Sequence, residues 1–192
     1  MQITTLTPPG GEPLSLADAK AFARIGSDLE DTLINDLIAA ARARLEAMTG
    51  MALMSRTLRL TLSEWPLGVL DQGALRLPKR PALALVSVRL TDGDGLDEDV
   101  SEAFTLETGL TPRLKPAPGQ GWVWPRSIHQ WLEIDWQAGF GSADDIPEDL
   151  VHAMKIIVAH EFENRDASDY RAQDRLRDRL RDALSAWQAV SL

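Results

Sequence analysis

The chain has 192 residues, contains no cysteine and carries 20 basic against 29 acidic side chains, for a net charge of −9. This length suits one domain with an appendage and is enough to bury a core without disulfides or a structural metal. The absence of cysteine excludes a disulfide scaffold, a Cys-ligated metal and a Cys nucleophile. The acidic balance argues against broad binding to nucleic acid phosphates. We find no secretory signal, and no apolar run long enough for a membrane span.

Two helices are predicted near the N-terminus, after residues 1–13, which are rich in Thr, Pro and Gly and look extended or loose. The first covers residues 15–25, where an initial serine hydroxyl can cap the first turn. The second covers residues 28–49. Its apolar residues recur at three- and four-residue steps from Leu29 to Met48, which is typical of a helix with one buried face.

The hydrophobic period then changes from 3.6 to 2, which predicts a small antiparallel sheet with long loops over residues 56–138. Apolar and polar side chains alternate in residues 57–62, 85–90 and 131–137. A further short strand is expected around Phe104. The segments between these strands are rich in proline and glycine, as turns and loops require.

Helical spacing returns over residues 147–165, and a last helix is predicted from Tyr170 to Ala189. The last helix has a narrow apolar stripe and alternating Arg and Asp residues, so it is unlike a polybasic arm. A single helix of this kind is not stable alone. It must fold back on its own domain or dock on a partner, and the residues leave both options open.

The predicted fold class is α+β, with the N-terminal helices and the late helix in a small bundle, an inserted antiparallel sheet and a C-terminal helical extension. In terms of domains, we expect a connecting body and a terminal extension. The body covers 1–167, with helices 15–25, 28–49 and 147–165 and the β insertion 56–138, and the extension covers 168–192.

Candidate catalytic and metal sites are weak. His160-Glu161 begins like the zinc-protease helix motif, but Asn164 stands where the second histidine is needed. The acidic segment 92–99 lacks the EF-hand order, and its Asp-Gly pairs favour a hairpin tip over a cation loop. There is also no serine elbow or phosphate-binding glycine loop. We therefore expect no enzymatic activity, no metal and no cofactor.

Four tryptophans, Trp122, Trp124, Trp131 and Trp136, fall within 15 residues. Few basic residues accompany them, so stacking on nucleic acid bases is disfavoured relative to packing in a core or an interface. Trp136 alternates as a core strand residue.

The order and spacing of these segments over residues 12–167 resemble the head–tail connector (adaptor) proteins of tailed phages and gene transfer agents. The matching pieces share a pattern of two helices, an L-P-x-x-P strand entry, a D-G-D-G hairpin, an A-G-F-G turn and a closing helix. They are S-L-A-D-A-K from Ser15, the helix Asp31 to Gly50, R-T-L-R-L-T-L from Arg56, the strand Arg76 to Gly95, W-L-E-I-D-W-Q-A-G-F-G from Trp131, and Ile146 to Asp166.

This resemblance implies a non-enzymatic subunit of a ring, expected to be a dodecamer, that sits below the portal protein and extends the DNA channel. It would join the capsid to a neck or tail-completion protein, in the neck of a phage-like particle assembled in the bacterial cytoplasm. DNA would pass through without specific binding, and no membrane would be involved. The alternatives are a DNA-binding neck or packaging-associated protein and, less favoured, a metal-dependent hydrolase.

The resemblance and the narrow stripe of the last helix together suggest where partners bind. For subunit contacts we expect Trp122, Trp124 and Trp131. For the portal we expect Arg171, Arg175, Leu176, Arg177, Arg179, Leu180, Arg181, Leu184 and Trp187.

Overall fold

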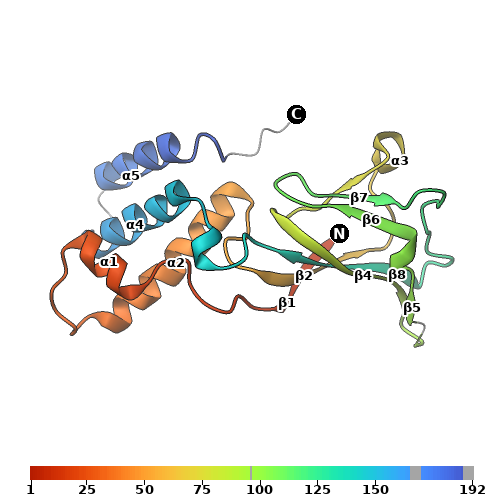
Figure 1. Ribbon diagram of the computed structural model, residues 1–192, viewed down its shortest axis with the longest axis horizontal. Helices are drawn as coiled ribbons and strands as arrows, with labels where there is room; N and C mark the ends of the chain where they lie inside the picture. The colour runs from red at the N-terminus through yellow and green to blue at the C-terminus, as the bar shows by residue number, and fades with distance from the viewer. Residues whose placement is uncertain (96, 165–169, 188–192) are drawn as a thin grey trace. The chain divides into compact units, whose positions relative to one another are not determined.

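The computed structural model covers the whole chain and describes residues 1–95, 97–164 and 170–187. Two compact units share the chain, each built from two segments (Figure 1). The first unit contains 1–10 and 55–140, and the second contains 11–54 and 141–192.

Both helices and antiparallel strands are present, which confirms the α+β class. The elements of the first unit are β1 (Gln2–Thr7), β2 (Arg56–Leu62), α3 (Val69–Gln72), β3 (Leu75–Arg76), β4 (Ala82–Asp92), β5 (Asp97–Asp99), η1 (Ser101–Ala103), β6 (Phe104–Glu107), β7 (Arg113–Pro116) and β8 (Gln130–Ala138). Those of the second unit are α1 (Leu16–Ala23), α2 (Asp31–Thr49), η2 (Ala143–Asp145), α4 (Glu148–Glu163) and α5 (Tyr170–Ala183).

The first unit is built on a five-stranded antiparallel sheet with the order β1-β2-β8-β4-β5. Alternation places one side chain in two against the core, so Leu60, Ile134 and Trp136 are buried completely. A second, three-stranded sheet has the order β3-β7-β6. The predicted single sheet over 56–138 therefore divides in two.

Residues 1–13 were expected to be extended or loose, and Gln2–Thr7 of this segment form an extended strand, β1. It pairs with β2 in register from Gln2↔Thr61 to Thr5↔Leu58, with an irregularity before Thr7. No local pattern indicates this strand, because all six of its side chains are exposed and its partner lies about fifty residues later in the sequence.

In the second unit, α1, α2 and α4 pack on one another and form the predicted bundle. Ser15 caps α1 as expected, accepting a hydrogen bond from the Asp18 amide at 3.1 Å. Helix α2 begins at Asp31 and not at residue 28, because the Ser27 hydroxyl accepts from the Leu29 amide and holds a turn. Leu29 is consequently 95% exposed and lies outside the apolar stripe.

The last helix is shorter than predicted. Helix α5 ends at Ala183, and the residues from Leu184 to Trp187 form turns. The predicted continuation to Ala189 lies partly outside the described residues, as does the predicted end of the preceding helix at Arg165. Among the described helices, none is both long and apolar enough to cross a bilayer.

Candidate functional site

The residues considered for metal chemistry have other partners in the fold. The Glu161 carboxylate accepts from Arg44 Nη1 at 2.7 Å, joining α4 to α2. His160 lies 3.4 Å from the Asn164 amide nitrogen through its Nδ1 atom. Within the described residues, no group of three or more His, Cys, Asp or Glu side chains is arranged to hold a metal ion.

The acidic segment between β4 and β5 is a hairpin tip, as its Asp-Gly pairs indicate. Asp92 accepts a hydrogen bond from the Asp94 amide at 2.9 Å, and Thr91 pairs with Asp97 across the hairpin. Arg89 then pairs with Asp97 at 3.1 Å. Two of the carboxylates are thus used within the hairpin: Asp92 caps the turn, and Asp97 pairs with Arg89.

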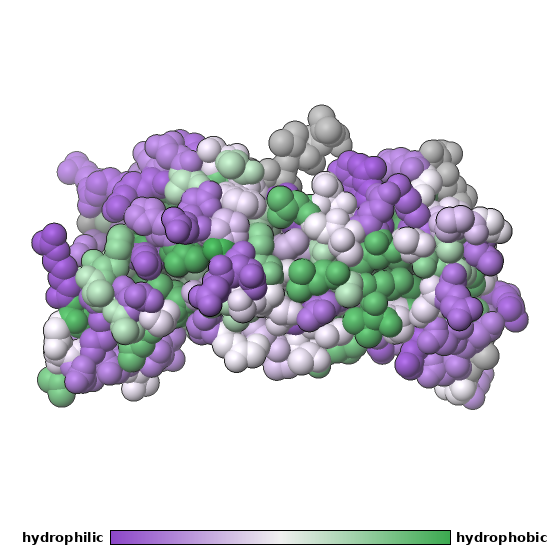
Figure 2. Space-filling model, in the orientation of Figure 1, coloured by the Kyte–Doolittle hydropathy of each residue, from purple (hydrophilic) through white to green (hydrophobic). Residues whose placement is uncertain are grey.

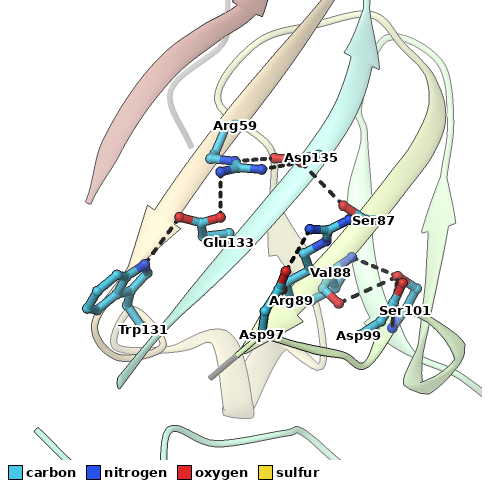
Figure 3. A network of polar contacts seen from close by, with 10 residues as sticks. All are labelled: Arg59, Ser87, Val88, Arg89, Asp97, Asp99, Ser101, Trp131, Glu133 and Asp135. Carbon is cyan, nitrogen blue, oxygen red and sulfur yellow. Dashed lines mark hydrogen bonds and ion pairs between the residues drawn. The ribbon is translucent and has the colours of Figure 1, made fainter. Parts of the chain in front are cut away.

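Polar side chains form a network on the non-core face of the five-stranded sheet (Figure 3). Arg59 in β2 donates from Nε and Nη2 to both oxygens of Asp135 in β8, at 2.7 and 2.8 Å, and its Nη1 contacts Glu133 at 2.5 Å. The Ser87 hydroxyl of β4 donates to Asp135 at 3.3 Å. Trp131 donates to Glu133 at 3.2 Å. Three strands are therefore tied together on this face.

Geometry explains the strength of the central pair. Arg59 and Asp135 are directly opposed in the β2–β8 register, which suits a two-bond contact between a planar guanidinium and a carboxylate. Asp135 is only 5% exposed, so its charge needs this partner. Its hydrogen bonds raise the pKa of Arg59, and the nearby charges of Asp135 and Glu133 act in the same direction.

The tryptophans proposed for subunit contacts are in three different settings. Trp122 packs within the chain, with its ring centroid 4.5 Å from that of Trp65 and 6.0 Å from that of Phe104. Trp65 Nε1 also donates to the Val123 carbonyl at 2.8 Å, fixing the loop. Trp131 belongs to the polar network. Trp124 is 46% exposed and is the one of the three that leaves a large apolar surface in the described chain.

The apolar stripe of the last helix is covered by its own chain. Leu176, Leu180 and Leu184 are almost completely buried, and α5 contacts α4 within the second unit. Trp187 Nε1 donates to Asp149 Oδ2 of α4 at 2.6 Å. Of the two options left open by the sequence, the described chain adopts the folded-back one. The leucines predicted as portal anchors are thus used inside the subunit.

The arginines of α5 divide into two sets, which the prediction from the sequence does not separate. Arg177 and Arg181 each pair with an aspartate three residues earlier, at 3.1 Å. Arg171, Arg175 and Arg179 follow at four-residue steps, are exposed, and form no ion pair with another described residue. Figure 2 shows mainly hydrophilic side chains over α5.

This second set is a row of like charges, which disfavours a helix slightly. The sequence could have separated the two sets, because only Arg177 and Arg181 have an aspartate three residues before them.

Comparison with known proteins gives one family and several solved structures. The model of the phage gp6-like head–tail connector family matches residues 13–103. A chain from the neck of an empty gene transfer agent particle, computed with C6 symmetry, aligns with a TM-score of 0.82 and 26% identity over 100% of this chain and 97% of that one. Two further chains have the same identity and coverage. One is from the virion of the native gene transfer agent particle, with a TM-score of 0.80. The other is from the native neck computed with C12 symmetry, with a TM-score of 0.78.

Among curated proteins, no match is found. The family match covers α1, α2 and the strands β2 to β5, whereas the structural likeness extends over the whole chain. Together they confirm the resemblance predicted from the sequence: the chain is similar to the phage gp6-like head–tail connector proteins over residues 13–103 and to neck chains of gene transfer agent particles over its whole length.

Proposed function

We propose that this chain is a structural connector subunit that forms a ring in the neck of a phage-like particle. The observation that carries the proposal is the full-length likeness to neck chains of gene transfer agent particles, whose necks were computed with C6 and C12 symmetry. Such symmetry favours a ring of twelve copies below the portal, joined to a neck or tail-completion protein on the other side. In a ring, each subunit contacts its neighbours through two different surfaces.

The proposed subunit is not an enzyme and lets DNA pass without specific binding. A net charge of −9 supports this, because an acidic wall repels phosphates and lets a duplex slide. Assembly in the bacterial cytoplasm follows from the same role.

Helix α5 is the proposed contact with the portal, and it offers two surfaces. Its outward arginine row, Arg171, Arg175 and Arg179, is accessible in the folded-back subunit and needs no rearrangement to bind acidic groups. Its leucine stripe is buried and becomes available only if α5 leaves α4, to which Trp187 is hydrogen-bonded through Asp149. These arginines are exposed and form no ion pair with another described residue, which supports the first surface for the initial contact.

Reconstitution with the portal complex of the same particle tests the proposal. Full-length protein is expected to form a ring on the portal by electron microscopy, with the subunit ratio given by native mass. A chain cut after Ala167 should remain folded but lose binding, since it lacks α5. Retention of binding by a folded 1–167 chain would place the portal contact elsewhere.

A matched pair of double variants separates the two arginine sets. Arg175→Gln with Arg179→Gln should weaken portal binding and reduce its salt dependence. Arg177→Gln with Arg181→Gln changes the net charge equally but removes arginines that already have intrahelical partners. Equal binding by both variants would refute the role of the unpaired row.

A further inference from the structure

Strand β1 is held to its sheet by backbone pairing with very little burial. All six of its side chains are exposed, including the large apolar Ile3 and Leu6. By contrast, the strand it pairs with, β2, buries Leu58, Leu60 and Leu62. The pairing therefore adds little to the hydrophobic core.

The segment that follows β1 has the composition of a hinge. Pro8, Pro9, Gly10 and Gly11 join β1 to residues of the second unit, and the division between the units falls after Gly10. Two prolines stiffen the chain, and two glycines allow a change of direction. Short hinge loops are where elements are exchanged between copies.

Chain length limits how far β1 could move. Glu12 is fixed to Arg42 of α2 by hydrogen bonds of 2.7 and 3.1 Å, and Leu14 is buried. The four hinge residues can span at most about 14 Å when extended. Exchange is therefore restricted to copies in direct contact, as in a closed ring.

The opposite edge of the sheet is protected and β1 is not. Strand β5 contains three acidic residues, Asp97, Glu98 and Asp99, which prevent edge pairing between copies. Strand β1 reads QITTLT, with no charge, no proline and four β-branched residues. An uncharged strand that buries no side chain can leave and rejoin a sheet without uncovering the core.

We propose that, in the assembled ring, β1 of each subunit pairs with β2 of its neighbour in the register that the single chain adopts. Every backbone hydrogen bond of the pairing is then kept, but it now joins two copies. Each subunit holds its neighbour through the N-terminal strand of its own chain. This inference rests on the proposed ring, and it names the strand through which neighbouring copies hold one another. In the single chain, β1 lies beside β2 (Figure 1).

Engineered cysteine pairs test the strand exchange. The chain contains no cysteine of its own, so every disulfide that forms joins introduced residues. Gln2→Cys with Thr61→Cys places one thiol on each strand at directly paired positions. Thr57→Cys with Gln137→Cys is the matched control, since β2 and β8 pair inside one subunit. Both variants are assembled on the portal under reducing conditions, checked for rings by electron microscopy, then oxidised and separated on a non-reducing denaturing gel.

Exchange predicts that oxidised rings of the β1–β2 variant run mainly as covalent dimers and larger species, while the control runs as a monomer. Rings in which the β1–β2 variant stays monomeric, with or without an internal disulfide, would overturn the exchange and leave the ring intact. Failure of the wild-type chain to form any ring on the portal would overturn the proposed function and this inference with it.

Discussion

Replacement of Leu180 by alanine tests whether α5 is folded back in solution. Leu180 has no exposed surface, and its neighbours in the stripe, Leu176 and Leu184, are 1% exposed. A buried Leu→Ala change costs about 2–5 kcal/mol. Because α5 can detach locally, the observed loss is limited to the free energy that docks this helix. We therefore expect Leu180→Ala to lower the docking free energy of α5 by about 2–3 kcal/mol, at the lower end of the range for buried leucines.

The appropriate measurement is hydrogen exchange of the α5 amides. A loss of about 2–3 kcal/mol corresponds to exchange roughly 30- to 150-fold faster, since about 1.4 kcal/mol is tenfold in an equilibrium constant. Amides of the central sheet should change little, because β2, β4 and β8 belong to the other unit. Exchange therefore reports the docking of α5 separately from global unfolding.

Arg179→Ala is the matched control, one residue away on the same helix but exposed. Exposed substitutions of this kind usually change stability by less than about 0.5 kcal/mol. If Leu180→Ala and Arg179→Ala altered α5 exchange equally, the leucine stripe would not be packed against α4 in the free subunit, and the folded-back description would be refuted.

Three smaller predictions follow from other contacts. Asp135→Asn removes the charge that holds Arg59 and should lower the free energy of unfolding by about 2 kcal/mol in urea titrations; an unchanged midpoint would argue against the paired geometry. Ser142→Ala should raise the pKa of Asp145 in NMR titrations, because the Ser142 hydroxyl and amide now hold that pKa below its ordinary value. These contacts therefore stabilise the fold above the ordinary pKa of an aspartate, and the contribution is lost as pH falls through the lowered value. Leu29→Ala should leave stability within about 0.5 kcal/mol, since this side chain is 95% exposed.

Elements with local periodicity were predictable from the sequence. The alternation around Leu132, Ile134 and Trp136 places these side chains in the core because every second residue of a strand points the same way. The late helix was predictable for a similar reason, with Leu150 and Ile157 buried on one face. In both cases the burial pattern is encoded within a dozen residues.

Elements that depend on distant partners were not predictable in the same way. Strand β1 has no buried side chain, so its pairing with β2 leaves no trace in its own pattern. The contact between Arg59 and Asp135 joins residues 76 positions apart, and alternation predicts only that both lie on the polar face. The packing of Trp122 on Trp65 likewise joins distant parts of the sequence, and the proximity of Trp122 to Trp124 does not predict it.

The folded-back α5 also separates two ways in which a partner can recognise this subunit. A partner that contacts Arg175 and Arg179 meets charges that are already exposed, so its affinity should depend on salt and not on the packing of α5. A partner that takes up the leucine stripe must first separate α5 from α4, and its apparent affinity falls by the fraction of subunits in which that has happened. The full docking free energy of α5, of which Leu180→Ala removes at least a part, is therefore the amount by which the second mode is weakened in the wild-type subunit. Recognition through the arginines carries no such penalty, which makes it the favoured first contact even where the leucines are the final one.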